Sequence, residues 1–171
     1  MRFLLKGLPG HPLHPPLTDM TIGAYTFAAA MAVLSRLGVS EHNTATAWWL
    51  AVITGLVFTI PTAITGFADW LYIEGGTPLW RTATIHLSVM LTATVVFAIT
   101  AGAGHADYTG GSVGGGSLVL TVVGYVLLAA GGWLGGAIVF THGMRVLKLV
   151  DEPTSRAISP LPKPEKEEAE A

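Results

Sequence analysis

Four long apolar stretches dominate the pattern of hydrophobic and polar positions along the chain. They cover approximately residues 16–37, 45–71, 80–101 and 117–147. A helix that crosses a bilayer needs about 20 mostly apolar residues, and each stretch provides that length. The pattern therefore predicts an all-α integral membrane protein built as a four-transmembrane-helix bundle.

Turn-forming residues separate these stretches and set the expected domain organisation. The short link from Glu74 to Pro78 predicts that the second and third helices form an antiparallel hairpin, and the glycine-rich run 102–116 predicts a flexible loop. Prolines and an acidic end indicate a disordered C-terminal tail. We expect a Pro/His-rich N-terminal segment at 1–15, a transmembrane domain at 16–150 and a disordered charged tail at 151–171.

Composition supports the membrane assignment and narrows the candidate chemistry. Only 12% of the 171 residues are charged, and the mean hydropathy is +0.57, whereas soluble domains usually carry about 25% charge. The net charge is -2 and the basic residues form no patch, which argues against nucleic acid as a partner. The chain has no cysteine, so disulfides and thiolate-ligated metal centres within it are excluded.

Basic residues are distributed unequally between the two ends of the predicted bundle. Four spans place both termini and the middle loop on one side, and the other side holds only Arg36. The basic residues near the spans on the first side are Arg2, Lys6, Arg81, Arg145 and Lys148. The positive-inside rule then places both termini in the cytoplasm.

Glycines form a stripe along the fourth predicted helix. Gly124, Gly131, Gly135 and His142 are separated by seven, four and seven residues, and this spacing puts them on one narrow face of an α-helix. In membranes such a stripe marks the close approach of another helix or of a flat ligand. We therefore expect His142 to point in the same direction as the three glycines.

Histidines gather near the predicted cytoplasmic end. His86 lies five residues after Arg81, and His142 lies three residues before Arg145, so both are expected about one turn below the cytoplasmic charges. Asp69 falls near the same depth. The sequence therefore predicts that His86 and His142 occupy matched depths on different helices.

The N-terminal segment adds two more histidines at the same membrane face. Prolines in the run from Gly10 to Pro16 favour an extended, polyproline-like path, which repeats every three residues. His11 and His14 should then share one side. They are candidates for contacts to a metal or to haem propionates, or for a lid over the site, and the alternative is a rigid segment that faces lipid headgroups.

The pair His86 and His142 admits three interpretations. The first is bis-imidazole ligation of a b-type haem, with neighbouring glycines leaving room for the macrocycle and arginines neutralising its propionates. The second is a role in binding a transition-metal ion or in handling protons, and the third is hydrogen bonding between helices without any ligand. The candidate cofactor-binding residues are His86, His142, Arg81, Arg145, Gly131 and Gly135, and the candidate metal ligands are His86, His142, His11, His14 and Asp69.

Asp69 and Arg81 flank the link between the second and third helices. Their proximity favours a salt bridge that closes the hairpin. The alternative is that Asp69 orients a ligand histidine, as carboxylates near metal-bound imidazoles often do.

Several motifs in order resemble a family of bacterial membrane proteins known as domain of unknown function 2231. They are the opening Gly10-His11-Pro12-Leu13-His14-Pro15, Asp69-Trp70, Arg81 with His86, and His142-Gly143, and the likeness covers approximately residues 10–150. Some members of that family are joined to a Rieske iron–sulfur domain. The resemblance implies the membrane fold and the histidine set, and it hints at redox partners.

Together these observations predict a haem-b-binding or electron-transfer protein in the bacterial inner (cell) membrane, with a His-rich site at the cytoplasmic end. The expected partners are the lipid bilayer and a quinone or redox protein, and a homodimer is plausible because of the glycine-lined helices. The alternatives are a metal-ion or proton-handling membrane protein and a cofactor-free accessory or assembly subunit of a redox complex. No nucleophile motif of a hydrolase is present in the sequence.

Overall fold

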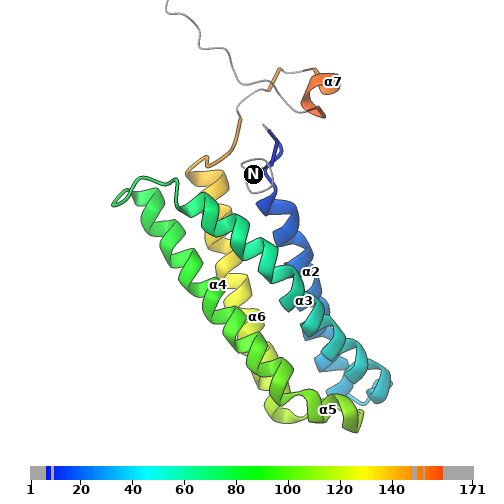
Figure 1. Ribbon diagram of the computed structural model, residues 1–171. Helices are drawn as coiled ribbons and strands as arrows, with labels where there is room; N and C mark the ends of the chain where they lie inside the picture. The colour runs from blue at the N-terminus through cyan, green and yellow to red at the C-terminus, as the bar shows by residue number, and fades with distance from the viewer. Residues whose placement is uncertain (1–6, 9, 148–149, 152, 160–171) are drawn as a thin grey trace, which may run out of the picture.

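Four long helices form the body of the protein (Figure 1). The computed structural model describes residues 7–8, 10–147, 150–151 and 153–159. The bundle consists of α2 (His14–Arg36), α3 (Glu41–Trp70), α4 (Pro78–Ala103) and α6 (Gly115–Gly136). Within the described residues all four are long and apolar enough to cross a membrane. The predicted four-helix transmembrane fold is confirmed.

Two of these helices begin with proline in the first turn. Pro15 and Pro16 follow His14 in α2, and Pro78 opens α4, where the Thr77 hydroxyl accepts a hydrogen bond from the Trp80 backbone N–H at 3.1 Å. Proline is well tolerated there because the first N–H groups of a helix have no partner within it. The predicted polyproline path therefore ends at His14, which is already helical.

The end of α6 departs from the simple span that the sequence predicts. The helix continues as the π-helix η1 (Ala137–Thr141), in which the His142 N–H bonds the Ala137 carbonyl at 3.0 Å. Gly143 and Arg145 then adopt positive φ angles of 67° and 62°. The chain therefore leaves the helix before residue 147, the predicted end of the span.

Two segments predicted to be irregular contain short helices. The loop 102–116 holds α5 (His105–Gly110), and the Asp107 side chain accepts a hydrogen bond from the Gly114 N–H at 2.8 Å. The C-terminal region holds α7 (Thr154–Ala157). Residues 160–171 of the predicted disordered tail lie outside the described residues, as do Arg2, Lys6 and Lys148 of the orientation argument.

The bundle is assembled from two helix hairpins. α2 packs mainly against α3, and α4 packs mainly against α6, while contacts of α2 with α6 and of α3 with α4 close the bundle (Figure 1). Alanine, glycine and threonine fill most of the interior, together with the buried rings of Trp48, Tyr25 and Phe97. Large apolar side chains such as Ile60 and Trp133 face outward. Small residues inside and large apolar residues outside are the arrangement that a lipid environment favours.

Candidate functional site

The polar residues singled out in the sequence gather at one end of the bundle. This end, called here the histidine end, is where α2 and α4 begin and α3 and α6 finish (Figure 1). It holds His14, Asp69, His86, His142 and Arg145. His42 and His105 lie near the opposite end, where α3 and α5 begin.

His86 is half-buried in α4 and contacts α6. Its Nδ1 lies 2.8 Å from the Gly131 carbonyl oxygen. A carbonyl only accepts hydrogen bonds, so Nδ1 carries the proton and donates, and Nε2 keeps the lone pair of the neutral ring. A methyl group added at Gly135 would lie 3.3 Å from His86 Cε1. Gly135 thus leaves room for this imidazole beside the backbone of α6, and Gly131 supplies the carbonyl that holds it.

His14 is held in the same way at the start of α2. Its half-buried ring places Nδ1 3.1 Å from the Thr62 carbonyl oxygen and 3.3 Å from Thr65 Oγ1 of α3. A methyl group added at Gly66 would lie 2.7 Å from His14 Cε1, so a larger residue there would force the ring to shift. The same argument assigns the proton to Nδ1 and leaves the Nε2 lone pair available. Sequence reasoning did not assign Thr62, Thr65 and Gly66 to the site, although their spacing along α3 is a detectable signal.

Asp69 forms an ion pair with Arg145 rather than with Arg81. Arg145 follows η1 with a positive φ angle, and its guanidinium lies against Asp69 near the end of α3. Arg81 lies in the first turn of α4 and is exposed. The predicted hairpin salt bridge is therefore wrong. Asp69 and Arg145 both interact electrostatically with His14.

His142 contacts α4, the same helix that the three glycines of the stripe face, as the sequence predicts. It is exposed, and its Nε2 lies 3.1 Å from Thr82 Oγ1. Thr82 precedes His86 by one helical turn, so His142 contacts α4 one turn before His86. The π-helix adds a residue to the last turn of α6 and rotates the residues after it, His142 included.

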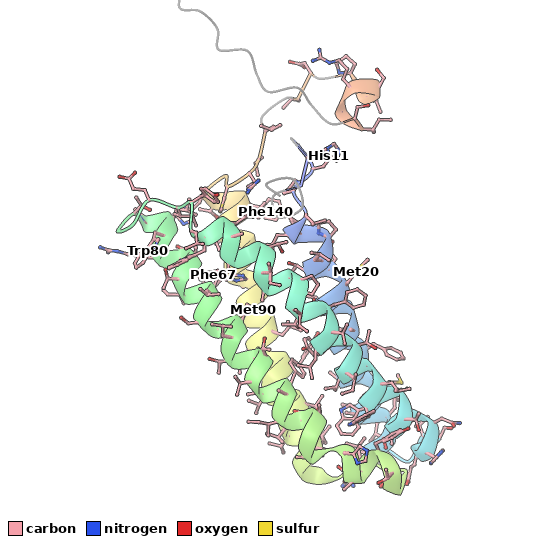
Figure 2. All side chains as sticks on the ribbon, viewed as in Figure 1. His11, Met20, Phe67, Trp80, Met90 and Phe140 are labelled. Carbon is pink, nitrogen blue, oxygen red and sulfur yellow. The ribbon has the colours of Figure 1, made fainter. Side chains whose placement is uncertain are left out.

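His11 lies apart from the other histidines of this end. It is exposed and pairs through its backbone with Leu8, and Figure 2 places its side chain beyond the start of α2, outside the bundle. His14, in contrast, is half-buried against α3. The two side chains therefore do not share one side as the polyproline path predicts.

The chemistry offered by this end is that of two half-buried imidazoles. Among the described residues, no group of three His, Asp or Glu side chains is arranged to hold a metal ion. His14 and His86 each have a fixed orientation and an Nε2 atom that can bind a metal centre or accept a proton. The partly exposed Arg145 lies at the same end, where it pairs with Asp69 and interacts electrostatically with His14.

The comparisons with known proteins give one match. Neither the curated proteins nor the solved structures contain a protein that matches this chain. The family model described as "Predicted membrane protein (DUF2231)" matches residues 10–148, which include the whole bundle and the histidine end. The chain therefore belongs to this family of predicted membrane proteins.

Proposed function

We propose that this protein is a membrane-embedded haem-b-binding or electron-transfer protein with its cofactor at the histidine end. One observation carries the proposal: the imidazole of His86 donates Nδ1–H to the Gly131 carbonyl, and its Nε2 is left as the coordinating atom. Metal-ligating histidines almost always donate their second ring nitrogen in this manner, because the bond fixes the tautomer and the ring orientation. The contact therefore holds the ring in a tautomer that suits a metal centre.

Several further features favour haem. Helix bundles commonly build cofactor sites from side chains on facing helices, and the four macrocycle nitrogens leave only one or two iron ligands for the protein to supply. Arg145 lies at the same end and suits a carboxylate such as a haem propionate. Bound haem would supply one-electron chemistry.

The orientation follows from the charges near the spans. The positive-inside rule assigns the histidine end and both termini to the cytoplasmic side of a bacterial inner membrane. A site at that depth, close to the membrane surface, is accessible to a quinone within the bilayer and to a redox protein at its surface.

An absorbance spectrum of the purified protein tests the proposal. We expect a Soret band at one haem per chain, and a His86→Ala variant should lose the band or show it strongly altered. His105→Ala is the matched control, because His105 is exposed near the opposite end. A preparation that remains colourless after expression with ample haem, and after reconstitution with it, would falsify the haem proposal.

The same preparation separates the two alternatives. A colourless protein with stoichiometric copper, zinc or iron indicates a metal-ion site at the same histidines. A colourless, metal-free protein indicates an accessory subunit without a cofactor.

A further inference from the structure

The first helices of the two hairpins, α2 and α4, carry similar side chains at corresponding positions. The number of residues between the two members of each pair is constant. His14 of α2 corresponds to His86 of α4, and Tyr25 corresponds in the same register to Phe97. Equivalent positions are also buried alike. In the same register, three buried residues of α2 correspond to three buried residues of α4. These are Thr21, Tyr25 and Ala28 against Ala93, Phe97 and Thr100.

The second helices match at a separation of their own, which is slightly shorter. Gly55 of α3 corresponds to Gly124 of α6, and Gly66 corresponds in the same register to Gly135. These glycines make the same contacts in both hairpins. Gly55 and Gly124 lie against the rings of Tyr25 and Phe97, and Gly66 and Gly135 lie against the rings of His14 and His86.

The carbonyl groups that hold the histidines also correspond. Thr62 and Gly131 match in the register of the second helices, and each accepts the Nδ1–H of the histidine in its own hairpin. The bundle is therefore an internal repeat of two hairpins.

A two-fold axis relates the hairpins. Tyr25 and Phe97, which occupy equivalent positions, stack on each other with ring centroids 3.7 Å apart and planes within 4°. Equivalent residues contact each other where a two-fold axis passes between them. α2 and α4 run in the same direction along the bundle, so the axis lies along the bundle (Figure 1). Membrane proteins with parallel repeats have such an axis along the membrane normal.

His14 and His86 occupy equivalent positions in the two hairpins on either side of this axis. Each precedes the stacked aromatic residue of its helix by eleven residues, which is close to three turns, or about 16 Å, and returns to the same helix face. The two imidazoles also interact electrostatically. His142 has no histidine equivalent, because the register of the second helices pairs it with Ile73.

We propose that His14 and His86 form a bis-imidazole ligand pair on the internal two-fold axis, one ligand from each hairpin, for the iron of haem. The inference rests on the proposed function and adds the identity of the second ligand. In this proposal His14 replaces His142 as the partner of His86 in the bis-imidazole interpretation. Each Nε2 is a lone-pair donor, so the two nitrogens are chemically equivalent toward iron.

Electron paramagnetic resonance and absorption spectra of the full-length protein, loaded with haem, test the pair. The wild-type protein should be six-coordinate and low-spin, and His14→Ala should convert it to a five-coordinate, high-spin form. Added imidazole should restore the low-spin signal, which a purely structural role of His14 does not predict. His11→Ala and His142→Ala are the controls and should keep the wild-type spectra.

A second variant keeps the test informative where His14→Ala does not fold. Gly66→Ala leaves both histidines in place, but its methyl group displaces the His14 ring, and it should lower the low-spin fraction. Gly132→Ala adds a methyl group where nothing lies within 4 Å and should leave the spectrum unchanged. A low-spin spectrum that survives His14→Ala but not His142→Ala overturns the ligand pair while the proposed function stands. Failure to bind any haem overturns both.

Discussion

The two hairpins hold their histidines with the same backbone contact, but they fill the space below them differently. In the α2–α3 hairpin, hydroxyl groups meet: Thr21 Oγ1 lies 3.1 Å from Thr62 Oγ1, and the Tyr25 hydroxyl lies 3.1 Å from Thr59 Oγ1. In the α4–α6 hairpin the equivalent positions carry no side-chain hydroxyl. They are Ala93, Gly131, Phe97 and Leu128.

The difference separates what the repeat requires from what it tolerates. Both halves keep a histidine, a carbonyl that accepts its Nδ1–H and a glycine beside its ring. The hydroxyl pairs occur in the first half, and Asp69, which forms an ion pair with Arg145 of the second half, has Ile138 as its equivalent. Hydrogen bonds between membrane helices contribute only about 0.6 kcal/mol on average. The two hairpins therefore share their close helix packing and the histidine–carbonyl contact, but not their polar interior contacts.

The largest expected effect comes from the stacked pair on the axis. Tyr25 is 2% exposed and Phe97 is 0% exposed. Truncating a buried aromatic residue to alanine costs about 3–5 kcal/mol, because contacts are lost and a cavity remains. We expect Tyr25→Ala and Phe97→Ala each to lower the free energy of unfolding in mixed micelles by roughly that amount.

A double-mutant cycle of these two substitutions measures the contact across the axis itself. Stacked aromatic pairs couple by about 0.5–1.5 kcal/mol beyond the area that they bury. Strictly additive effects would show that the rings pack independently and would weaken the two-fold arrangement.

A smaller effect is expected from the two glycines that face these rings. A methyl group added at Gly124 would lie 2.9 Å from Phe97 Cζ, and one added at Gly55 would overlap the Tyr25 ring even more closely. Overpacking of this kind costs about 1–3 kcal/mol. Gly55→Ala and Gly124→Ala should therefore both be destabilising, which thermal unfolding in detergent would measure.

Gly132→Ala is the matched control for both glycine variants. It lies on α6 with nothing within 4 Å of the added methyl group. Alanine favours a helix over glycine by about 1 kcal/mol, so this variant should be neutral or slightly stabilising. If Gly124→Ala behaves like Gly132→Ala, the tight approach between α4 and α6 is contradicted.

The sequence was sufficient to predict the spans and one helix face. Hydropathy identified all four helices because a bilayer demands long apolar runs. The glycine spacing in α6 correctly predicted a face that packs closely, since Gly124, Gly131 and Gly135 all contact α4. His142 also contacts α4, through Thr82, although a π-helix interrupts the α-helical period between Gly135 and His142.

The internal repeat was harder to detect, and with it the pairing of His14 with His86. The step from His14 to His86 is longer than the step from Gly66 to Gly135, so no single period aligns the halves. Identical residues recur at few positions, and the aromatic pair changes from tyrosine to phenylalanine. The prolines after His14 also suggested an extended segment rather than a helix start. Only the contacts reveal that these positions are equivalent.

The smallest effect is expected from a substitution that makes the two hairpins identical at the aromatic stack on the axis. Tyr25→Phe removes the hydroxyl that lies 3.1 Å from Thr59 Oγ1 and leaves a phenylalanine on each side of the stack. Thr59 still donates to the Gly55 carbonyl at 2.8 Å, so no donor is left without an acceptor. We expect a loss of about 0.6 kcal/mol in the free energy of unfolding, against no change for Tyr125→Phe, whose ring is partly exposed on α6. A loss several times larger would mean that the hydroxyls of the first hairpin are essential to its packing, and the polarity of that half would then be a requirement rather than a tolerated difference.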